Sequence, residues 1–338
     1  MRRMYAEWEP QRCVVMSFPH VGTDWYDPSD PQSLHKALTP FIRIAQAIAY
    51  KEPVYILCDE VDAIKSLFCS TYNMIFWKLP SNDTWIRDFG PIGIEEDGQT
   101  KLLDFTFDGW GGKFDAELDN AVNRKLHATG LLAPLAMESI DFVLEGGSIE
   151  SDGRGTILTT ASCLCHPNRN GGLNKAQVEA KLHDYLGATR ILWLEHGYLA
   201  GDDTDGHIDT LARFVSPDTI VYAACDDPDD EHYDALQAMK RELESFNTAE
   251  GKPYRLVPLP LPRAIYDDNG RRLPATYANF LITNDALVFP TYADQERDKQ
   301  AEAIFKELFP TKEVIGVNCL KLIEQGGSLH CSTMQIAR

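Results

Sequence analysis

Short apolar runs of strand type alternate with helical segments along almost the whole chain, and no other feature restricts the fold as strongly. Strands are predicted at residues 13–18, 54–57, 102–107, 156–159, 191–194, 219–223, 277–283 and 314–317. Helices are predicted over residues 32–50, 115–130, 174–186, 230–247 and 294–309. This alternation is typical of an α/β protein. Because no Gly/Ser-rich linker or low-complexity block interrupts it, we expect a single domain over residues 1–338.

A strongly acidic balance limits the partners of this chain. The 51 acidic and 32 basic residues give a formal net charge of -19, which serves solubility but also repels phosphate backbones and concentrates small cations. We therefore expect no nucleic-acid partner. The first residues lack the apolar core of a signal peptide, and no run of about 18 apolar residues follows. These features predict a cytoplasmic protein without a membrane partner.

The eight cysteines lack the paired spacing of a disulfide framework, which suits reduced thiols. The segment at residues 163–166 (Cys-Leu-Cys-His) is one residue short of a zinc knuckle and has no second pair, so we assign it to packing. Cys331 differs because its segment carries two glycines, where the backbone can approach a ligand closely. We predict that Cys331 is a nucleophile.

A second polar motif, residues 201–209, contains a proton carrier and several carboxylates. A strand predicted over residues 208–215 would point His207 and Asp209 to one face. His207 could then accept the thiol proton, protonate departing ammonia and activate water. A calcium loop is excluded, because aligning Asp203 and Asp205 with ligand positions puts Ala212 at the last position. A metallohydrolase site of Asp205, His207 and Asp209 remains an alternative.

Two acidic residues farther upstream lie beside glycines, at a predicted turn and a predicted strand end. Asp88 follows Trp85 and precedes a Gly-Pro pair. Its carboxylate could bind two N–H groups of a guanidinium, with Trp85 as a wall or as a face for the cation. Glu145 ends an apolar run and could orient His207. Trp110, in a Trp-Gly-Gly segment, is a candidate for substrate packing and equally plausible as core.

The thiol, the histidine and the carboxylates are together the groups that guanidine hydrolysis requires. A guanidinium has a pKa above about 12, so it stays cationic at neutral pH. Its delocalised charge makes the central carbon a poor electrophile, and a strong nucleophile is needed. Carboxylates can hold the cation while a thiolate attacks this carbon.

The chemistry-bearing motifs recur at a nearly constant interval. Asp88 and Glu145 are 57 positions apart, Glu145 and His207 are 62 apart, and His207 and Cys331 are 124 apart, which is twice 62. If each interval is one supersecondary unit, the chain contains about five units, each delivering a polar loop to a shared centre. Self-similarity between the units is weak, so coincidence explains the spacing alone at least as well.

These motifs, in this order, resemble the agmatine deiminase and Porphyromonas-type peptidylarginine deiminase family within the guanidine-modifying superfamily. The resemblance runs nearly end to end. It rests on residues 6–10 (Ala-Glu-Trp-Glu-Pro), 82–91 (Asn-Asp-Thr-Trp-Ile-Arg-Asp-Phe-Gly-Pro), 109–112 (Gly-Trp-Gly-Gly), 144–148 (Leu-Glu-Gly-Gly-Ser), 168–170 (Asn-Arg-Asn), 206–209 (Gly-His-Ile-Asp) and 326–331 (Gly-Gly-Ser-Leu-His-Cys). The last motif departs from the agmatine enzymes, which carry a third glycine and an Asn-Ile pair, and this leaves the exact substrate open.

The resemblance implies a five-bladed α/β propeller, or pentein, built from ββαβ-type units around a pseudo-fivefold axis. It implies that Cys331 is the nucleophile, His207 the general acid/base, Asp88 and Asp209 the guanidinium clamps, and Glu145 a partner of the histidine or of a substrate nitrogen. The implied reaction converts agmatine and water to N-carbamoylputrescine and ammonia, in the arginine-to-polyamine route, through a covalent Cys-amidino intermediate. No cofactor or metal is implied.

Two other functions stay open at this point. One is a peptidylarginine deiminase that forms citrulline, and the other is a non-catalytic polyamine- or guanidine-binding protein. The expected partner in each case carries a cationic guanidine or amine, and a small free guanidine suits the acidic chain best. A homodimer is compatible with the sequence, which does not determine the oligomeric state.

Overall fold

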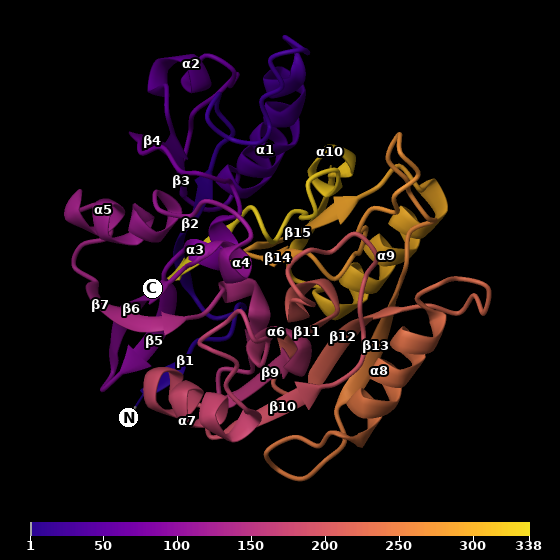
Figure 1. The fold of residues 1–338 in the computed structure, drawn as a ribbon. Helices are drawn as coiled ribbons and strands as arrows, with labels where there is room; N and C mark the ends of the chain where they lie inside the picture. Colours follow the sequence, from indigo (N-terminus) through magenta and orange to yellow (C-terminus); the bar gives the residue numbers. More distant parts are fainter. Residues whose placement is uncertain (1) are drawn as a thin grey trace.

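Five small mixed sheets surround a common centre in the computed structural model, which describes residues 2–338 (Figure 1). Their strand orders are β1-β5-β6-β7, β10-β9-β8, β11-β12-β13, β14-β15-β16 and β17-β2-β3-β4. The strands are β1 (Arg2–Met4), β2 (Gln11–Ser17), β3 (Val54–Cys58), β4 (Met74–Lys78), β5 (Ile92–Glu96), β6 (Gln99–Thr106), β7 (Ala136–Val143), β8 (Ile149–Ser151), β9 (Thr156–Thr160), β10 (Arg190–Leu194), β11 (Ala212–Ser216), β12 (Thr219–Ala224), β13 (Arg255–Pro260), β14 (Leu281–Ile282), β15 (Ala286–Thr291), β16 (Glu313–Asn318) and β17 (Met334–Ala337).

The longer helices lie around the periphery of the ring, as Figure 1 shows for α1, α5, α7, α8 and α9. The α-helices are α1 (Ser33–Ala49), α2 (Val61–Lys65), α3 (Ile86–Phe89), α4 (Gly109–Gly112), α5 (Val122–Ala128), α6 (Ala161–Leu164), α7 (Lys175–Leu186), α8 (Tyr233–Ser245), α9 (Gln295–Leu308) and α10 (Leu320–Ile323). Three 3-10 helices are η1 (Asp119–Ala121), η2 (Gly146–Ser148) and η3 (Ile208–Thr210).

Each sheet repeats one pattern of strand pairing. An antiparallel pair is followed by a helix and then by a strand parallel to the second member, as in β8, β9, α7 and β10. The units with β11, β12 and β13, and with β14, β15 and β16, have the same pairing. Because parallel strands need a long crossover, each unit carries its helix outside the sheet. This repeat confirms the pentein fold that the resemblance implied.

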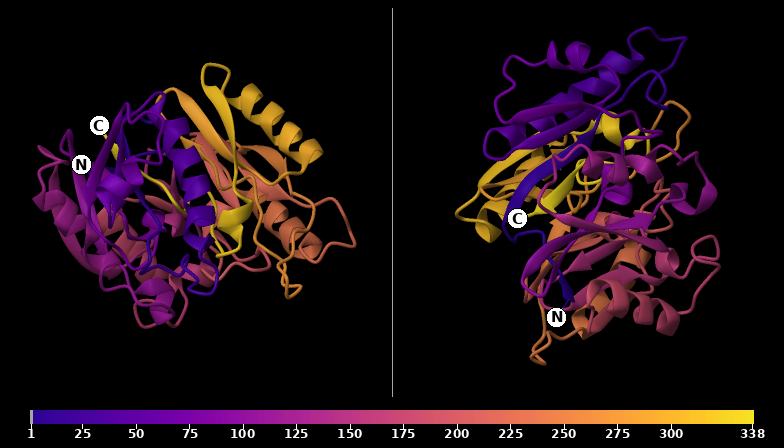
Figure 2. Two further views of the ribbon diagram at one scale, coloured as in Figure 1. Left: turned by 90° about the horizontal axis from the view of Figure 1, so that it is seen from above. Right: turned by 90° about the vertical axis from the view of Figure 1, so that its left-hand side faces the viewer.

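The fifth sheet joins the two ends of the chain. β17 pairs antiparallel with β2, with Met334 opposite Val15, and β2 runs parallel to β3. The last strand therefore lies beside an early one and closes the ring (Figure 2). Cys331 lies three residues before β17, so this closure brings it to the motifs from the first half of the chain.

Apolar runs form the central strands because those strands are covered on both faces. Every residue of β3 and β9 is buried, and so are the first five residues of β12 and of β15. Helix α1 buries Phe41, Ile44 and Ile48 against this core, at the spacing that places side chains on one helix face. A capping box of Asn174 and Gln177 begins α7, and a left-handed Gly187 ends it.

Three predicted elements differ from the structure, and in two of them polar side chains explain the difference. Only Leu281–Ile282 of the run at 277–283 is a strand, because the Ala278 and Phe280 carbonyls accept hydrogen bonds from the buried Arg213. The helix predicted over 115–130 begins at Val122, because the Asp119 carboxylate binds the backbone N–H groups of residues 82 and 83. Residues 208–210 form η3 instead of a strand.

No helix among residues 2–338 is long and apolar enough to cross a lipid bilayer.

Candidate active site

A cavity of about 210 Å³ lies where loops from several units converge. Asp88, His207, Asp209 and Cys331 all line it. Trp85 and Trp110 line it too, and Glu145 lies fully buried behind His207. The structure thus brings together the five residues of the predicted catalytic set and both predicted pocket tryptophans.

Asp88 is held rigidly on α3. Its Oδ2 accepts a hydrogen bond from Trp110 Nε1 at 3.0 Å, and its Oδ1 accepts one from the Gly147 N–H at 2.9 Å. A Cβ at residue 147 would lie 2.7 Å from both Asp88 Oδ1 and His207 Nδ1, so the second glycine of the Glu-Gly-Gly motif is required by close approach. Burial raises the pKa of Asp88 to about 6, while His207 and Trp110 oppose this rise.

His207 lies between two carboxylates. Its Nδ1 is 3.5 Å from Asp88 Oδ1, and its Nε2 is 3.8 Å from Glu145 Oε2. Burial alone would lower the pKa of His207, but the Asp88 carboxylate and contacts with Cys163 and Glu145 raise it well above its ordinary value. Neither ring nitrogen has a hydrogen-bond partner within residues 2–338. The free imidazolium N–H groups are thus available for proton transfer.

The turn at residues 208–210 replaces the predicted strand but still directs His207 and Asp209 to one place. The Thr210 hydroxyl donates to the His207 carbonyl at 2.9 Å, and the Leu211 N–H donates to the Ile208 carbonyl at 3.0 Å. Asp209 therefore follows His207 on a tight 3-10 turn. Both side chains still line the cavity.

Asn279 connects the thiol with Asp209, and this residue was missed in the sequence. Its Nδ2 lies 3.3 Å from both Cys331 Sγ and Asp209 Oδ2. Its Oδ1 accepts hydrogen bonds from the backbone N–H groups of His330, at 2.8 Å, and Cys331, at 3.3 Å. A lone asparagine in an apolar run carried no signal for this role, because its partners are 51 or more positions away.

Cys331 carries a thiol whose proton is held tightly in the free protein. Burial and the nearby Asp209 and Asp88 carboxylates raise the pKa of Cys331 well above its ordinary value. Only 6% of the residue is exposed, and it lines the cavity. A Cβ at Gly327 would lie 2.6 Å from the Trp85 ring, so this glycine lets the cysteine segment pack on the tryptophan.

Trp110 adopts a left-handed backbone conformation, with φ 56° and ψ 49°. Its indole packs edge-on against Phe107 and Phe114, with centroid distances of 5.0 and 5.6 Å. Only glycine adopts this region without strain, and such outliers concentrate at functional sites. Here the strained conformation directs the indole N–H at Asp88.

Two further residues complete the site, and the sequence did not assign them roles there. Arg169 Nε donates to Glu145 Oε1 at 2.9 Å, and its guanidinium also pairs with Asp205. The Asn-Arg-Asn motif was the only signal for this contact. Cys163, which we had assigned to packing, has its sulfur 3.9 Å from Glu145 Oε2. It borders the site from behind.

The metal triad of Asp205, His207 and Asp209 does not form. The Asp205 carboxylate is bound by Arg169 and Lys113, while Asp209 Oδ2 is directed at His330. Over residues 2–338, two other groups place three ligand atoms within 4.8 Å, namely Glu145 with Cys163 and His207, and Glu7 with Glu150 and His330. An arginine already pairs with a carboxylate in each group, Arg169 in the first and Arg213 in the second.

Comparison with known proteins places this geometry in a family. The model of the Porphyromonas-type peptidyl-arginine deiminase family matches residues 3–337. The agmatine deiminase of Pseudomonas aeruginosa (strain LESB58) is 35% identical over 358 residues, which cover 98% of this chain and 95% of that protein.

Solved structures give the same result. A C. jejuni agmatine deiminase with substrate bound superposes with a TM-score of 0.92 at 40% identity, covering 100% of this chain and 97% of that chain. The agmatine deiminase of Enterococcus faecalis gives 0.89 at 30% identity, covering 100% and 96%. A dimethylarginine dimethylaminohydrolase gives 0.54 at 13% identity, covering 96% and 100%, and shares the fold.

Proposed function

The chain belongs to the Porphyromonas-type peptidyl-arginine deiminase family, which includes agmatine deiminases, and we propose that it is itself a guanidine deiminase acting on agmatine. The products are N-carbamoylputrescine and ammonia. The proposal treats residues 1–338 as one catalytic unit. One observation carries it: the Cys331 thiol opens into a cavity that Asp88 and Asp209 line and that His207 borders.

The substrate cation itself activates the thiol. In the free protein, burial and two carboxylates raise the pKa of Cys331. A guanidinium bound between Asp88 and Asp209 brings positive charge beside the sulfur and neutralises these carboxylates, which lowers the pKa of the thiol again. Thiolate therefore forms mainly when the substrate is in place, and the nucleophile stays protected at other times.

The first half-reaction exchanges a C–N bond for a C–S bond. The Cys331 sulfur attacks the guanidinium carbon, and one NH2 group leaves as ammonia. The proton that completes this ammonia comes from His207, whose raised pKa keeps it an imidazolium at neutral pH. The thiol proton passes to solvent when the substrate binds, and His207 becomes neutral and ready to accept a proton in the next step. Glu145 and Asp88 flank the ring and stabilise the imidazolium. An amidinium thioether on Cys331 remains.

The second half-reaction is a hydrolysis. Water attacks the thioether carbon, with His207 accepting its proton, and the C–S bond breaks to regenerate the thiol. The carbon leaves as a ureido group. The one proton released overall converts ammonia to ammonium, so the sum is guanidinium plus water giving urea derivative plus ammonium.

The charge around the cavity supports agmatine over a peptide. Besides the clamps, the lining includes Asp24, Asp83, Asp202, Asp203 and Glu324. Arg271 is the only basic side chain apart from His207 among the described residues that line it. The second cation of agmatine suits these carboxylates, whereas a carboxylate of free arginine or of a peptide end would be repelled.

A substrate panel tests this proposal. Ammonia release would be measured with agmatine, free arginine, an arginine peptide and methylated arginine. We expect the highest kcat/KM with agmatine. A higher kcat/KM with the peptide would identify a peptidylarginine deiminase instead, and binding of guanidines without any turnover would identify a non-catalytic binding protein.

A further inference from the structure

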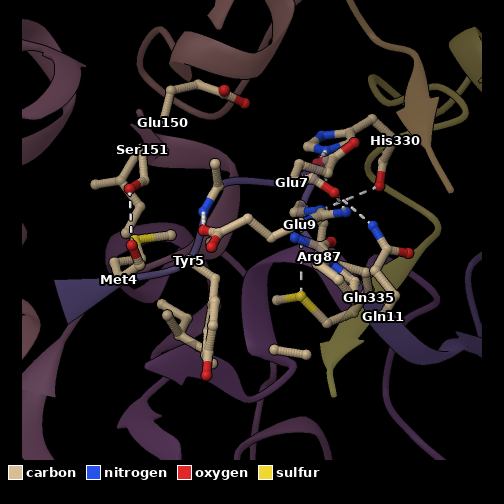
Figure 3. A pocket seen from close by; sticks show the side chains of 18 residues that line it. Met4, Tyr5, Glu7, Glu9, Gln11, Arg87, Glu150, Ser151, His330 and Gln335 are labelled. Carbon is tan, nitrogen blue, oxygen red and sulfur yellow. Dashed lines mark hydrogen bonds and ion pairs between the residues drawn. The ribbon is translucent and has the colours of Figure 1, made fainter. Parts of the chain in front are cut away.

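The N-terminal motif at residues 6–10 lies behind the active site, where the proposed reaction gives it no role. Glu7 follows β1 and is 8% exposed. Its Oε2 lies 2.7 Å from His330 Nε2, and both side chains are labelled in Figure 3. His330 is the residue before the nucleophile Cys331. A segment from the start of the chain therefore contacts the catalytic segment from its rear.

His330 links Glu7 to the substrate clamp Asp209. Its second ring nitrogen, Nδ1, lies 2.8 Å from Asp209 Oδ2. This contact and Asn279 Nδ2 hold one oxygen of Asp209, whereas Oδ1 has no hydrogen-bond partner in the described chain. Because Asp209 lines the cavity, the held oxygen orients the free one for a substrate N–H.

The two short contacts of His330 require more protons than the groups carry in their usual forms. Each nitrogen–carboxylate contact needs one proton, and ionised Glu7 and Asp209 can only accept. A neutral imidazole supplies one proton, so both contacts form together only when the chain of three groups holds one additional, shared proton. Burial and the nearby Arg213 and Arg87 lower the pKa of His330, whereas the Glu7 carboxylate opposes this fall and favours the shared proton. Hydrogen bonds that involve charged partners of this kind are short and strong. The Asp209 carboxylate thus depends on Glu7 through the ring of His330.

The charged groups around this chain hold Glu7 in place. Arg213 Nη2 donates to Glu7 Oε2 at 2.8 Å, and the Ile282 N–H donates to Oε1 at 2.7 Å. Arg213 also pairs with Glu150, and Arg87 Nη2 lies 3.8 Å from Glu7 Oε2. These partners belong to segments from different sheets. Glu7 is therefore held in place by residues from several segments of the propeller.

We propose that Glu7 is a positioning residue, which acts through His330 to hold the Asp209 carboxylate in the orientation that binds the guanidinium. The proposal rests on the proposed function for the identity of the ligand. The hydrogen-bonded chain itself exists in the free protein and can be tested without substrate.

The binding test uses the full chain with Cys331→Ser, which blocks turnover. The dissociation constant of agmatine would be measured by calorimetry for this protein, for its Glu7→Gln and Asp209→Asn derivatives, and for the combination of all three changes. Glu7→Gln should raise the dissociation constant about fivefold to tenfold, the difference between a charge-assisted and a neutral hydrogen bond. In the Asp209→Asn background the same change should raise it less than about twofold, because coupled residues are not additive.

A matched control comes from the same motif. Glu7 and Glu9 both line a small pocket behind the catalytic segment (Figure 3). Glu9 pairs with Arg3 and forms no hydrogen bond or ion pair with His330 within residues 2–338. Glu9→Gln should leave the dissociation constant within about twofold. Equal effects of Glu7→Gln in both Asp209 backgrounds would show a merely structural role and overturn the proposal, and so would no effect of Glu7→Gln at all.

A second measurement separates this proposal from the proposed function. Nitrogen-15 NMR of labelled histidines in the free, unsubstituted protein should show both ring nitrogens of His330 in protonated, strongly hydrogen-bonded form. Glu7→Gln should convert one of them to an unprotonated acceptor. An unprotonated His330 nitrogen already present before substitution would overturn the shared proton and with it the proposal. Failure to bind any guanidine would instead refute only the proposed function, and the NMR result would still decide the role of Glu7.

Discussion

Removing one hydrogen-bond donor from Asp88 should shift the pH at which the enzyme becomes active. In Trp110→Phe the ring still packs edge-on against Phe107 and Phe114, but the 3.0 Å hydrogen bond from the indole N–H to Asp88 Oδ2 is lost. Asp88 must be ionised to hold a cation. Activity is therefore present above its pKa and is lost as the pH falls through it.

The size of the shift follows from the contact. Burial has already raised the pKa of Asp88 to about 6, and the Trp110 hydrogen bond limits this rise. A buried hydrogen bond to a charged group stabilises by about 1.5–3 kcal/mol, and about 1.4 kcal/mol corresponds to one pKa unit. Loss of the donor should raise the pKa by about one to two units. The acid limb of kcat/KM should move to higher pH by the same amount.

The assay is the pH dependence of kcat/KM for agmatine, because this quantity reports groups of the free enzyme. Trp25→Phe is the matched control. Trp25 is also buried and donates its indole N–H to the Thr84 hydroxyl at 2.9 Å, but it does not touch Asp88. It should lower the unfolding temperature without moving the acid limb. An unchanged acid limb in Trp110→Phe, or an equal shift in Trp25→Phe, would refute the reasoning.

Other perturbations have equally definite outcomes. Cys331→Ser should abolish ammonia release while calorimetry still detects agmatine binding, and persisting turnover would exclude this nucleophile. His207→Gln should lower kcat by about 10²–10⁴-fold with binding largely retained, and a near-normal kcat would contradict its role as proton carrier. Arg169→Met should lower the free energy of unfolding by about 3–5 kcal/mol, because it leaves the buried Glu145 carboxylate unpaired, as chemical denaturation would show. EDTA should leave kcat unchanged, whereas loss of activity that a divalent ion restores would require a metal.

The sequence predicted those site residues that can be recognised from their immediate neighbours in the chain. Asp88 and Glu145 stand beside glycines, and the structure explains why, since Gly147 leaves room for Asp88 and His207. Alternating apolar runs were enough to indicate an α/β fold with helices such as α1 and α7. In these cases the residues that determine the structure are neighbours in the chain.

The remaining parts depend on contacts between distant positions, which spacing does not encode. Asn279 looked like an interruption of an apolar strand, but its amide organises the nucleophile segment 52 positions away. The pairing of Glu7 with His330, 323 positions away, likewise appears only when the ring closes. Arg169 reaches Glu145 across 24 positions, which the residue pattern also does not encode. Buried polar side chains need hydrogen-bond partners, but the sequence does not show which distant residues those partners are.

Mass spectrometry of Cys331 during turnover tests the central claim most directly. Protein mixed with agmatine would be quenched in acid within one turnover and digested, and the peptide containing Cys331 would be weighed. We predict that this peptide gains the mass of agmatine less ammonia, and that His207→Gln changes how much of the adduct accumulates. Rapid ammonia release with an unmodified Cys331, or with the adduct on another residue, would contradict the account.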